Sequence, residues 1–146
     1  MTVKSSAFNA IQLEVLWTRL ISIVDEAAKA IVRTAFSTLS NEANDFACVL
    51  TDARGRSLAQ NSGSIPSFIA TLPATVRHFL DHFGAENMKP GDIFVTNDPW
   101  KGTGHLPDVC IVQPIFRGDL LVGFSATTSH VPDIGGRIRS LEAREI

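Results

Sequence analysis

Hydrophobic and polar positions in the first quarter of the chain alternate with the period of an α-helix. From Asn9 to about Leu39, apolar side chains recur three and four residues apart, and charged residues lie mostly off that face. No glycine or proline interrupts this span, so the pattern predicts one long helix. We interpret its apolar stripe as a core or subunit contact, a more usual role for this period than cofactor binding. The stripe comprises Trp17, Leu20, Ile21, Val24, Ala27, Ala28, Ile31, Val32 and Ala35.

The next part of the chain predicts a β-hairpin followed by a short helix. Residues 46–60, FACVLTDARGRSLAQ, read as two strands joined by a turn at residues 52–55, and residues 61–68 read as a loop. In TLPATVRHFLDHFG, Thr71 can cap a helix, Pro73 suits its first turn and Gly84 suits its end. The pattern therefore predicts a helix that begins near Thr71 and ends at Gly84.

A second hairpin is predicted towards the end of the chain. A brief strand, Ile93–Thr96, and a turn-rich loop precede the apolar runs VCIVQPIF and LLVGFSATT. Pro114 cannot donate to a strand ladder, so its strand is expected to be bulged or at an edge there. The predicted fold class is α+β: a long N-terminal helix packed with antiparallel hairpins and one short helix. At this length, residues 1–146 are expected to form a single domain.

Composition narrows the function classes. With 45% hydrophobic residues and a net charge of −2, the chain lacks the electrostatic footprint of a protein that binds nucleic acid or a membrane surface. Cys48 and Cys110 stand in apolar runs without CxxC spacing, which predicts buried thiols in a reducing compartment. No signal peptide or run of about 20 apolar residues is present. We therefore expect a cytoplasmic protein, and the charged C-terminus without a stop signal is typical of a piece of a longer chain.

A repeated tetrapeptide is the main chemical signal. His-Leu-Pro-Asp at 105–108 recurs as His-Val-Pro-Asp at 130–133 and uses two of the four histidines. The proline disfavours a helix, which places each motif on a loop or a strand end. A turn centred on residues 118–119 pairs Asp108 with Ser129, so both motifs should meet at the open end of the second hairpin. We therefore expect His105, Asp108, His130 and Asp133 to converge.

Two imidazoles and a carboxylate suit a divalent cation. Hydrolytic zinc sites use two histidines, an acid and water, and non-haem iron uses a similar set. The second aspartate could then act as a general base or hold a ligating histidine. Aspartate and proline are also common at strand ends, and the histidines could be ordinary loop residues. The pattern alone leaves both interpretations open.

Other candidate motifs are weaker. His78 and His82 have the i, i+4 spacing of zinc ligands on a helix, but no glutamate follows the first. Both lie more than about 100° from the apolar face of their helix, so we expect them to be exposed. The chain has no phosphate loop, no GxGxxG and no Gly-x-Ser-x-Gly, which disfavours nucleotide binding and serine nucleophiles. Neither cysteine has a setting that would activate it.

Residues 91–137, GDIFVTNDPWKGTGHLPDVCIVQPIFRGDLLVGFSATTSHVPDIGGR, resemble the N-terminal region of the hydantoinase B/oxoprolinase family. This family also includes the large subunits of acetone and acetophenone carboxylases. The shared elements are Asn-Asp-Pro, His-x-x-Asp and His-x-x-Asp-x-Gly-Gly in this order. EANDFACVLTDARGRSLAQ at 42–60 and the long first helix are similar too. The family's subunits run to several hundred residues, so the chain is expected to be the N-terminal segment of a larger subunit.

The resemblance implies a divalent metal site of His105, Asp108 and His130, holding zinc, manganese or iron(II). It also implies an ATP-binding hydantoinase A-type partner that phosphorylates the oxygen of a cyclic amide or ketone substrate, within a hetero-oligomer. Metal-activated water would then attack the activated amide. Asp133 and Asp98 become candidates for orienting that water or the ligating histidines.

Three functions follow from the resemblance as hypotheses. The first is the metal-binding portion of an ATP-dependent hydantoinase- or oxoprolinase-type cyclic amide hydrolase, such as an N-methylhydantoinase. The second is a subunit of the acetone or acetophenone carboxylase type. The third is a metal-free assembly module that docks the ATP-binding subunit through the apolar stripe of the first helix, since a long exposed stripe suits an obligate interface.

Overall fold

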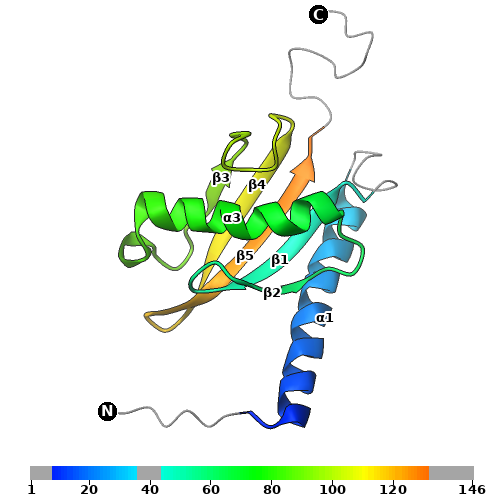
Figure 1. Ribbon diagram of the computed structural model, residues 1–146, viewed down its shortest axis with the longest axis vertical. Helices are drawn as coiled ribbons and strands as arrows, with labels where there is room; N and C mark the ends of the chain where they lie inside the picture. Colours follow the sequence, from blue (N-terminus) through cyan, green and yellow to red (C-terminus); the bar gives the residue numbers. More distant parts are fainter. Residues whose placement is uncertain (1–7, 36–43, 132–146) are drawn as a thin grey trace, which may run out of the picture.

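The structure, a computed structural model, describes residues 8–35 and 44–131. One long helix, one shorter helix and an antiparallel sheet of five strands confirm the α+β class (Figure 1). The strand order is β2-β1-β5-β4-β3. Along the chain the elements are α1 (Ala10–Thr34), β1 (Phe46–Asp52), β2 (Ser57–Gln60), α3 (Pro66–Phe83), a 3-10 turn η1 (Ala85–Asn87), β3 (Phe94–Thr96), β4 (Asp108–Arg117) and β5 (Leu120–His130).

Helix α1 begins where the sequence predicts. Asn9 and Gln12 form a capping box: the Gln12 backbone N–H donates to Asn9 Oδ1 at 2.8 Å, and the Asn9 N–H donates to Gln12 Oε1 at 3.1 Å. The helix ends at Thr34, since Ala35 has an extended backbone. The predicted helix, which reached about Leu39, was therefore too long at its C-terminal end.

Most of the predicted apolar stripe on α1 is covered, and its exposed members are Trp17 and Ala27. Val24 and Ala28 are buried on the sheet face formed by Phe46, Cys48, Leu50 and Ala59. Earlier in the helix, Trp17 is 55% exposed, because α1 extends past the edge of the sheet (Figure 1). Neither helix in the described part of the chain is long and apolar enough to cross a membrane.

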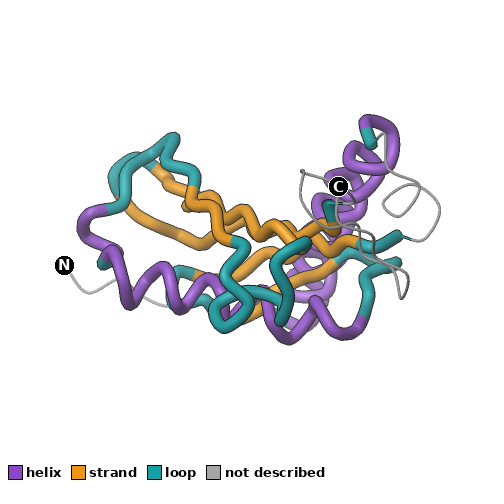
Figure 2. Tube along the Cα trace, turned by 90° about the horizontal axis from the view of Figure 1, so that it is seen from above, coloured by secondary structure: helices purple, strands orange, loops and turns teal. Residues whose placement is uncertain are grey.

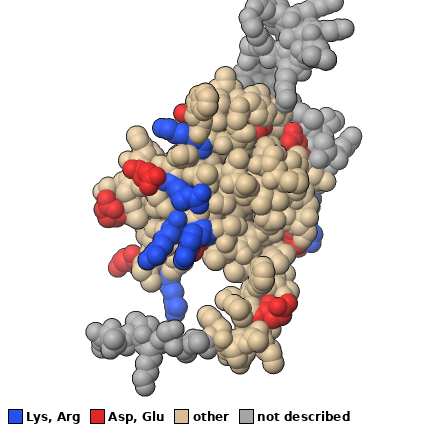
Figure 3. All heavy atoms as spheres, viewed as in Figure 1, with Lys and Arg blue, Asp and Glu red and all other residues tan. Residues whose placement is uncertain are grey.

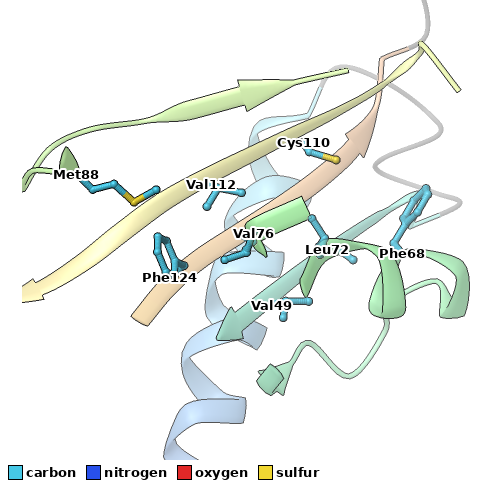
Figure 4. Packing of buried hydrophobic residues seen from close by; sticks show 10 residues of the cluster. Val49, Phe68, Leu72, Val76, Met88, Cys110, Val112 and Phe124 are labelled. Atoms are coloured by element: carbon cyan, nitrogen blue, oxygen red, sulfur yellow. The ribbon is translucent and has the colours of Figure 1, made fainter. Parts of the chain in front are cut away.

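Helix α3 covers the opposite face of the sheet, so the strands lie between the two helices (Figure 2). The larger core fills this second interface, and Figure 4 shows how its side chains interlock. Each strand alternates between the two faces, as the period of two requires. The buried members of this core are Ala47, Val49, Phe68, Leu72, Val76, Met88, Cys110, Val112, Phe124 and Ala126.

The predicted start of the shorter helix was wrong. The helix begins at Pro66 rather than near Thr71, and Pro73 lies inside it. Pro66 is the favourable first-turn proline, while Pro73 deprives one carbonyl of its helical donor. Burial of Phe68 and Leu72 against the sheet offsets that loss. The C-terminal prediction is confirmed, because Gly84 caps the helix with a φ of 75°.

Both hairpins are confirmed, with one error of register. In the first, Asp52 Oδ1 accepts from the backbone N–H groups of Arg54 and Arg56 at 2.9 Å, which closes the predicted turn. In the second, Asp108 pairs with His130, not Ser129. The ladder shifts between Ile115 and Phe116, so one extra residue of β5 lies between the turn and the open end. The extra residue is Val122 of β5, so the bulge is not in the strand of Pro114. Pro114 lies beyond Val112, where the described pairing of β4 with β3 ends, which confirms that its strand is at an edge there.

Candidate metal centre

The open end of the second hairpin holds the candidate site. Asp108 is the first residue of β4 and His130 the last of β5, and they are direct cross-strand partners. The Val131 N–H donates to the Pro107 carbonyl at 2.8 Å, which closes the end of the pair. His105 lies in the turn just before β4. The register shift improves the predicted geometry, because it puts the aspartate and the histidine directly opposite each other.

Three of the four predicted residues converge. His105 Nε2 lies 2.7 Å from Asp108 Oδ2, and His130 Nδ1 lies 3.0 Å from Asp108 Oδ1. The two imidazole rings stack, with centroids 5.2 Å apart. One ligand atom from each residue lies within 4.8 Å of the others. The fourth residue, Asp133, lies outside the described residues.

The Asp108 carboxylate has an unusual environment for a charge. The residue is 1% exposed, and its described side-chain partners are the two imidazoles and the Thr103 hydroxyl, which donates to Oδ2. In residues 8–35 and 44–131, neither lysine nor arginine forms an ion pair with it. Burying an uncompensated carboxylate is costly, so the site calls for positive charge from the imidazoles or from a cation.

The donor set fits a divalent metal. Two nitrogens and a carboxylate are ligands that zinc, manganese and iron(II) accept. Metal–ligand bonds of roughly 2.0–2.2 Å place neighbouring ligand atoms about 3 Å apart, close to the observed 2.7 and 3.0 Å nitrogen–oxygen distances. His105 has a 35% exposed side chain, whereas Asp108 is enclosed. The site is therefore closed to solvent at Asp108 and open to solvent at His105.

Asp45 is a neighbour that sequence reasoning missed. Its Oδ2 lies 3.9 Å from His130 Nδ1, and its backbone carbonyl accepts from the His130 N–H at 3.1 Å. It precedes β1, whose first residue pairs with Ser129 of β5. Asp45 lies far before His105 in the chain, within the family-like segment 42–60, but nothing in that segment links it to the histidines. Its place beside His130 follows from the pairing of β1 with β5, which requires the fold. It supplies a second carboxylate beside the His130 imidazole.

Asp98 is placed differently. It is not in the group whose ligand atoms gather within 4.8 Å, and its Oδ1 accepts from the Trp100 backbone N–H at 2.9 Å. It lines a separate cavity with His78 and His82. Both of these histidines are exposed, as predicted. The role assigned to Asp98 in orienting water or histidines stays a prediction.

The cysteines behave as predicted. Cys48 and Cys110 are both free and buried. Burial raises the pKa of the Cys48 thiol to about 12. Burial also raises the pKa of Cys110, against the opposing effect of hydrogen bonds with Thr128 and Thr75. Neither thiol is suited to be a nucleophile near neutral pH.

Comparison with known proteins decides the family. The sequence profile of hydantoinase B/oxoprolinase matches residues 9–145. The chain belongs to the hydantoinase B/oxoprolinase family. One relative is 5-oxoprolinase 1 of Arabidopsis thaliana, 35% identical over 128 residues, which cover 88% of this chain and 10% of that protein. Another is a putative D-/L-hydantoinase subunit of Pseudomonas sp. (strain NS671), 33% identical over 129 residues, or 87% and 22% of the two chains.

Two solved structures that share the fold are consistent with this family assignment. An acetone carboxylase, in a nucleotide-free structure concerned with ATP-dependent acetone carboxylation, superposes with a TM-score of 0.77 at 26% identity, covering 88% of this chain and 17% of that one. The ATP-dependent caprolactamase of Pseudomonas jessenii superposes with a TM-score of 0.76 at 25% identity, covering 90% and 22%. This hydantoinase B/oxoprolinase chain thus spans between a tenth and a quarter of these relatives.

Proposed function

We propose that this chain is the metal-holding part of an ATP-dependent cyclic amide hydrolase of the hydantoinase/oxoprolinase type. One observation carries the proposal: a carboxylate that is 1% exposed lies between two imidazoles at the end of a hairpin. Membership of a family that includes 5-oxoprolinases and hydantoinases supplies the reaction class.

Each side chain at the candidate metal centre has its own role in this proposal. Asp108, His105 and His130 would hold zinc, manganese or iron(II), which when bound polarises a carbonyl and lowers the pKa of water. The Thr103 hydroxyl holds the Asp108 carboxylate in place. Asp45, 3.9 Å from His130 Nδ1, can orient that imidazole or accept a proton from the nucleophilic water. The partly exposed His105 marks the side from which substrate would enter.

Activation of the substrate by ATP is assigned to a partner. The sequence has no phosphate loop, whereas the caprolactamase of the same fold is ATP-dependent. We propose an ATP-binding hydantoinase A-type subunit that phosphorylates the substrate oxygen, in a cytoplasmic hetero-oligomer. Because the chain spans between a tenth and a quarter of its relatives, activity is expected only with the rest of such a complex.

The metal site is tested by cobalt titration of the chain after treatment with a chelator and removal of the chelator. One equivalent of Co²⁺ should bind and give the visible absorption of a histidine-containing site. His105→Ala and His130→Ala should each lose this binding. His82→Ala is the matched control, because it removes an exposed imidazole elsewhere, and it should bind as wild type does. Equal binding by all three variants would refute the assignment.

The reaction class is tested separately in the assembled complex. The proposal predicts ATP-dependent opening of a cyclic amide. The carboxylase alternative, favoured by the likeness to acetone carboxylase, predicts instead ATP-dependent incorporation of labelled bicarbonate into a ketone. Carboxylation without amide opening would replace the hydrolase proposal by the carboxylase one.

A second candidate function is docking without metal chemistry. The N-terminal half of α1 carries exposed apolar side chains, including Ile11 at 76%, Leu13 at 53% and Trp17 at 55%, and mostly uncharged atoms cover this end of the molecule in Figure 3. Such a surface suits an interface with the ATP-binding subunit. Leu13→Glu should then abolish co-purification with that subunit, while chelator has no effect. Stoichiometric metal that is needed for activity would argue against a purely docking role.

A further inference from the structure

A second cavity, separate from the metal centre, lies between α3 and the edge strand β3. Its volume is about 150 Å³, and it is lined by α3, by β3 and by the loop that follows β3. Its apolar part comes from Phe79, Phe83 and Val95. The two rings also pack on Phe94, with centroid distances of 5.4 and 4.9 Å. The aromatic wall is therefore held in place by the core.

The polar part of the cavity is rich in donors. His78 and His82 approach it from successive turns of α3, and Lys101 approaches from the loop. In the described part of the chain none of these three side chains has a hydrogen bond or ion pair. The His82 ring makes only an edge contact with the Phe83 ring. The one carboxylate in the lining, Asp98, already accepts from the Trp100 N–H. The cavity therefore places one ammonium and two imidazoles beside a single carboxylate, so its cationic and N–H groups outnumber its anionic one.

Size and chemistry together define a ligand class. A cavity of about 150 Å³ has room for about five water molecules, at about 30 Å³ each, and hence for a molecule of about six heavy atoms. An ammonium and imidazole N–H groups on one side favour an anion with directional acceptors, such as a carboxylate. An aromatic wall on the other favours a short hydrocarbon tail. We propose that this cavity binds a small carboxylate with an apolar tail.

The cavity is a site distinct from the metal centre, although one loop borders both. Asp98 and Lys101 line the cavity, and Thr103 donates to Asp108 of the metal centre. The proposal does not depend on metal binding, so it can fail or succeed independently of the proposed function.

Proton NMR of the histidine rings tests the proposal on the chelated, metal-free chain. Sodium butyrate is the probe, and butyramide and butylammonium chloride are controls of similar shape at equal ionic strength. Butyrate should shift the signals of His78 and His82 saturably, with a dissociation constant in the millimolar range for so small a ligand. His78→Gln and His82→Gln assign the two signals. The signals of His105 and His130 should move little.

A charge variant then identifies the anchor. Lys101→Met keeps an unbranched side chain that is one atom shorter and removes its charge, so it should raise the butyrate dissociation constant about threefold to tenfold. Lys89→Met is the matched control, because Lys89 does not line the cavity, and it should leave the constant unchanged. Equal binding of butyramide, shifts confined to His105 and His130, no saturable shift, or wild-type affinity in Lys101→Met would each overturn the proposal.

Discussion

Replacing Asp108 by asparagine should affect stability differently with and without metal. The substitution keeps the shape of the side chain, which is 1% exposed, and removes its buried charge. Without metal, the loss of a charged acceptor for two imidazoles is offset by the lower desolvation cost of a neutral amide. We expect the free energy of unfolding of the metal-free variant to stay within about 1 kcal/mol of wild type.

With metal, the difference should be large. A ligand at about 100 times its dissociation constant stabilises the folded state by about 2.7 kcal/mol. A chain of 146 residues has an unfolding entropy of about 0.3 kcal/mol/K, so this raises the Tm by about 9 °C. If asparagine weakens binding about 100-fold, the same metal concentration contributes only about 0.4 kcal/mol, or about 1 °C.

Differential scanning calorimetry of both proteins, with chelator and with added Zn²⁺ or Mn²⁺, measures these four Tm values. His78→Ala is a control that should keep the full metal-dependent shift, because this exposed histidine lies away from the centre. The reasoning is refuted if Asp108→Asn gains as much Tm from metal as wild type does. It is also refuted if wild type gains none.

Three further predictions concern single positions. Gly123→Ala should lower the free energy of unfolding in urea by at least about 2 kcal/mol, because a Cβ there would lie 2.3 Å from the Thr51 carbonyl oxygen. Gly63→Ala is the control and should change stability little, because nothing lies within 4 Å of its Cβ. Equal losses in the two variants would contradict the pairing of β1 with β5. Asp45→Asn should weaken metal binding about tenfold in a chelator competition, and an unchanged constant would remove Asp45 from the centre. The pKa of Cys48 is raised to about 12 in the folded chain, so as the pH rises the thiol ionises in the unfolded chain before it does in the folded one. Above about pH 9 the free energy of unfolding should therefore fall by up to about 1.4 kcal/mol per pH unit. Thermal melts of Cys48→Ala should lack this part of the decline.

Local signals predicted much of the secondary structure. The start of α1 at Asn9, the turn after Asp52 and the glycine cap at Gly84 each depend on residues within one turn of the chain. These features were therefore readable without tertiary contacts. The start of α3 was misjudged because Pro73 carries a first-turn signal, and the burial that lets the helix continue through it belongs to the packed state.

The candidate site was partly predictable for a similar reason. A hairpin with a short turn relates its two strands by numbering alone, so the meeting of His105, Asp108 and His130 followed from their spacing. The register was off by one residue because a bulge near Phe116 depends on how both strands pack. Asp45 could not be found this way, since it reaches His130 through the pairing of β1 with β5.

By itself, the sequence determined the periodic elements, most of their ends and the motif spacing that brings His105, Asp108 and His130 together, because these depend on hydrogen bonds and apolar faces within a few residues or on numbering about one turn. The tertiary structure decided which half of α1 is covered, where Asp45 lies and how deeply Asp108 is buried. Those outcomes depend on contacts between strands and helices far apart in the chain. Such contacts form only where the whole set of faces packs at once, so no short stretch of sequence encodes them.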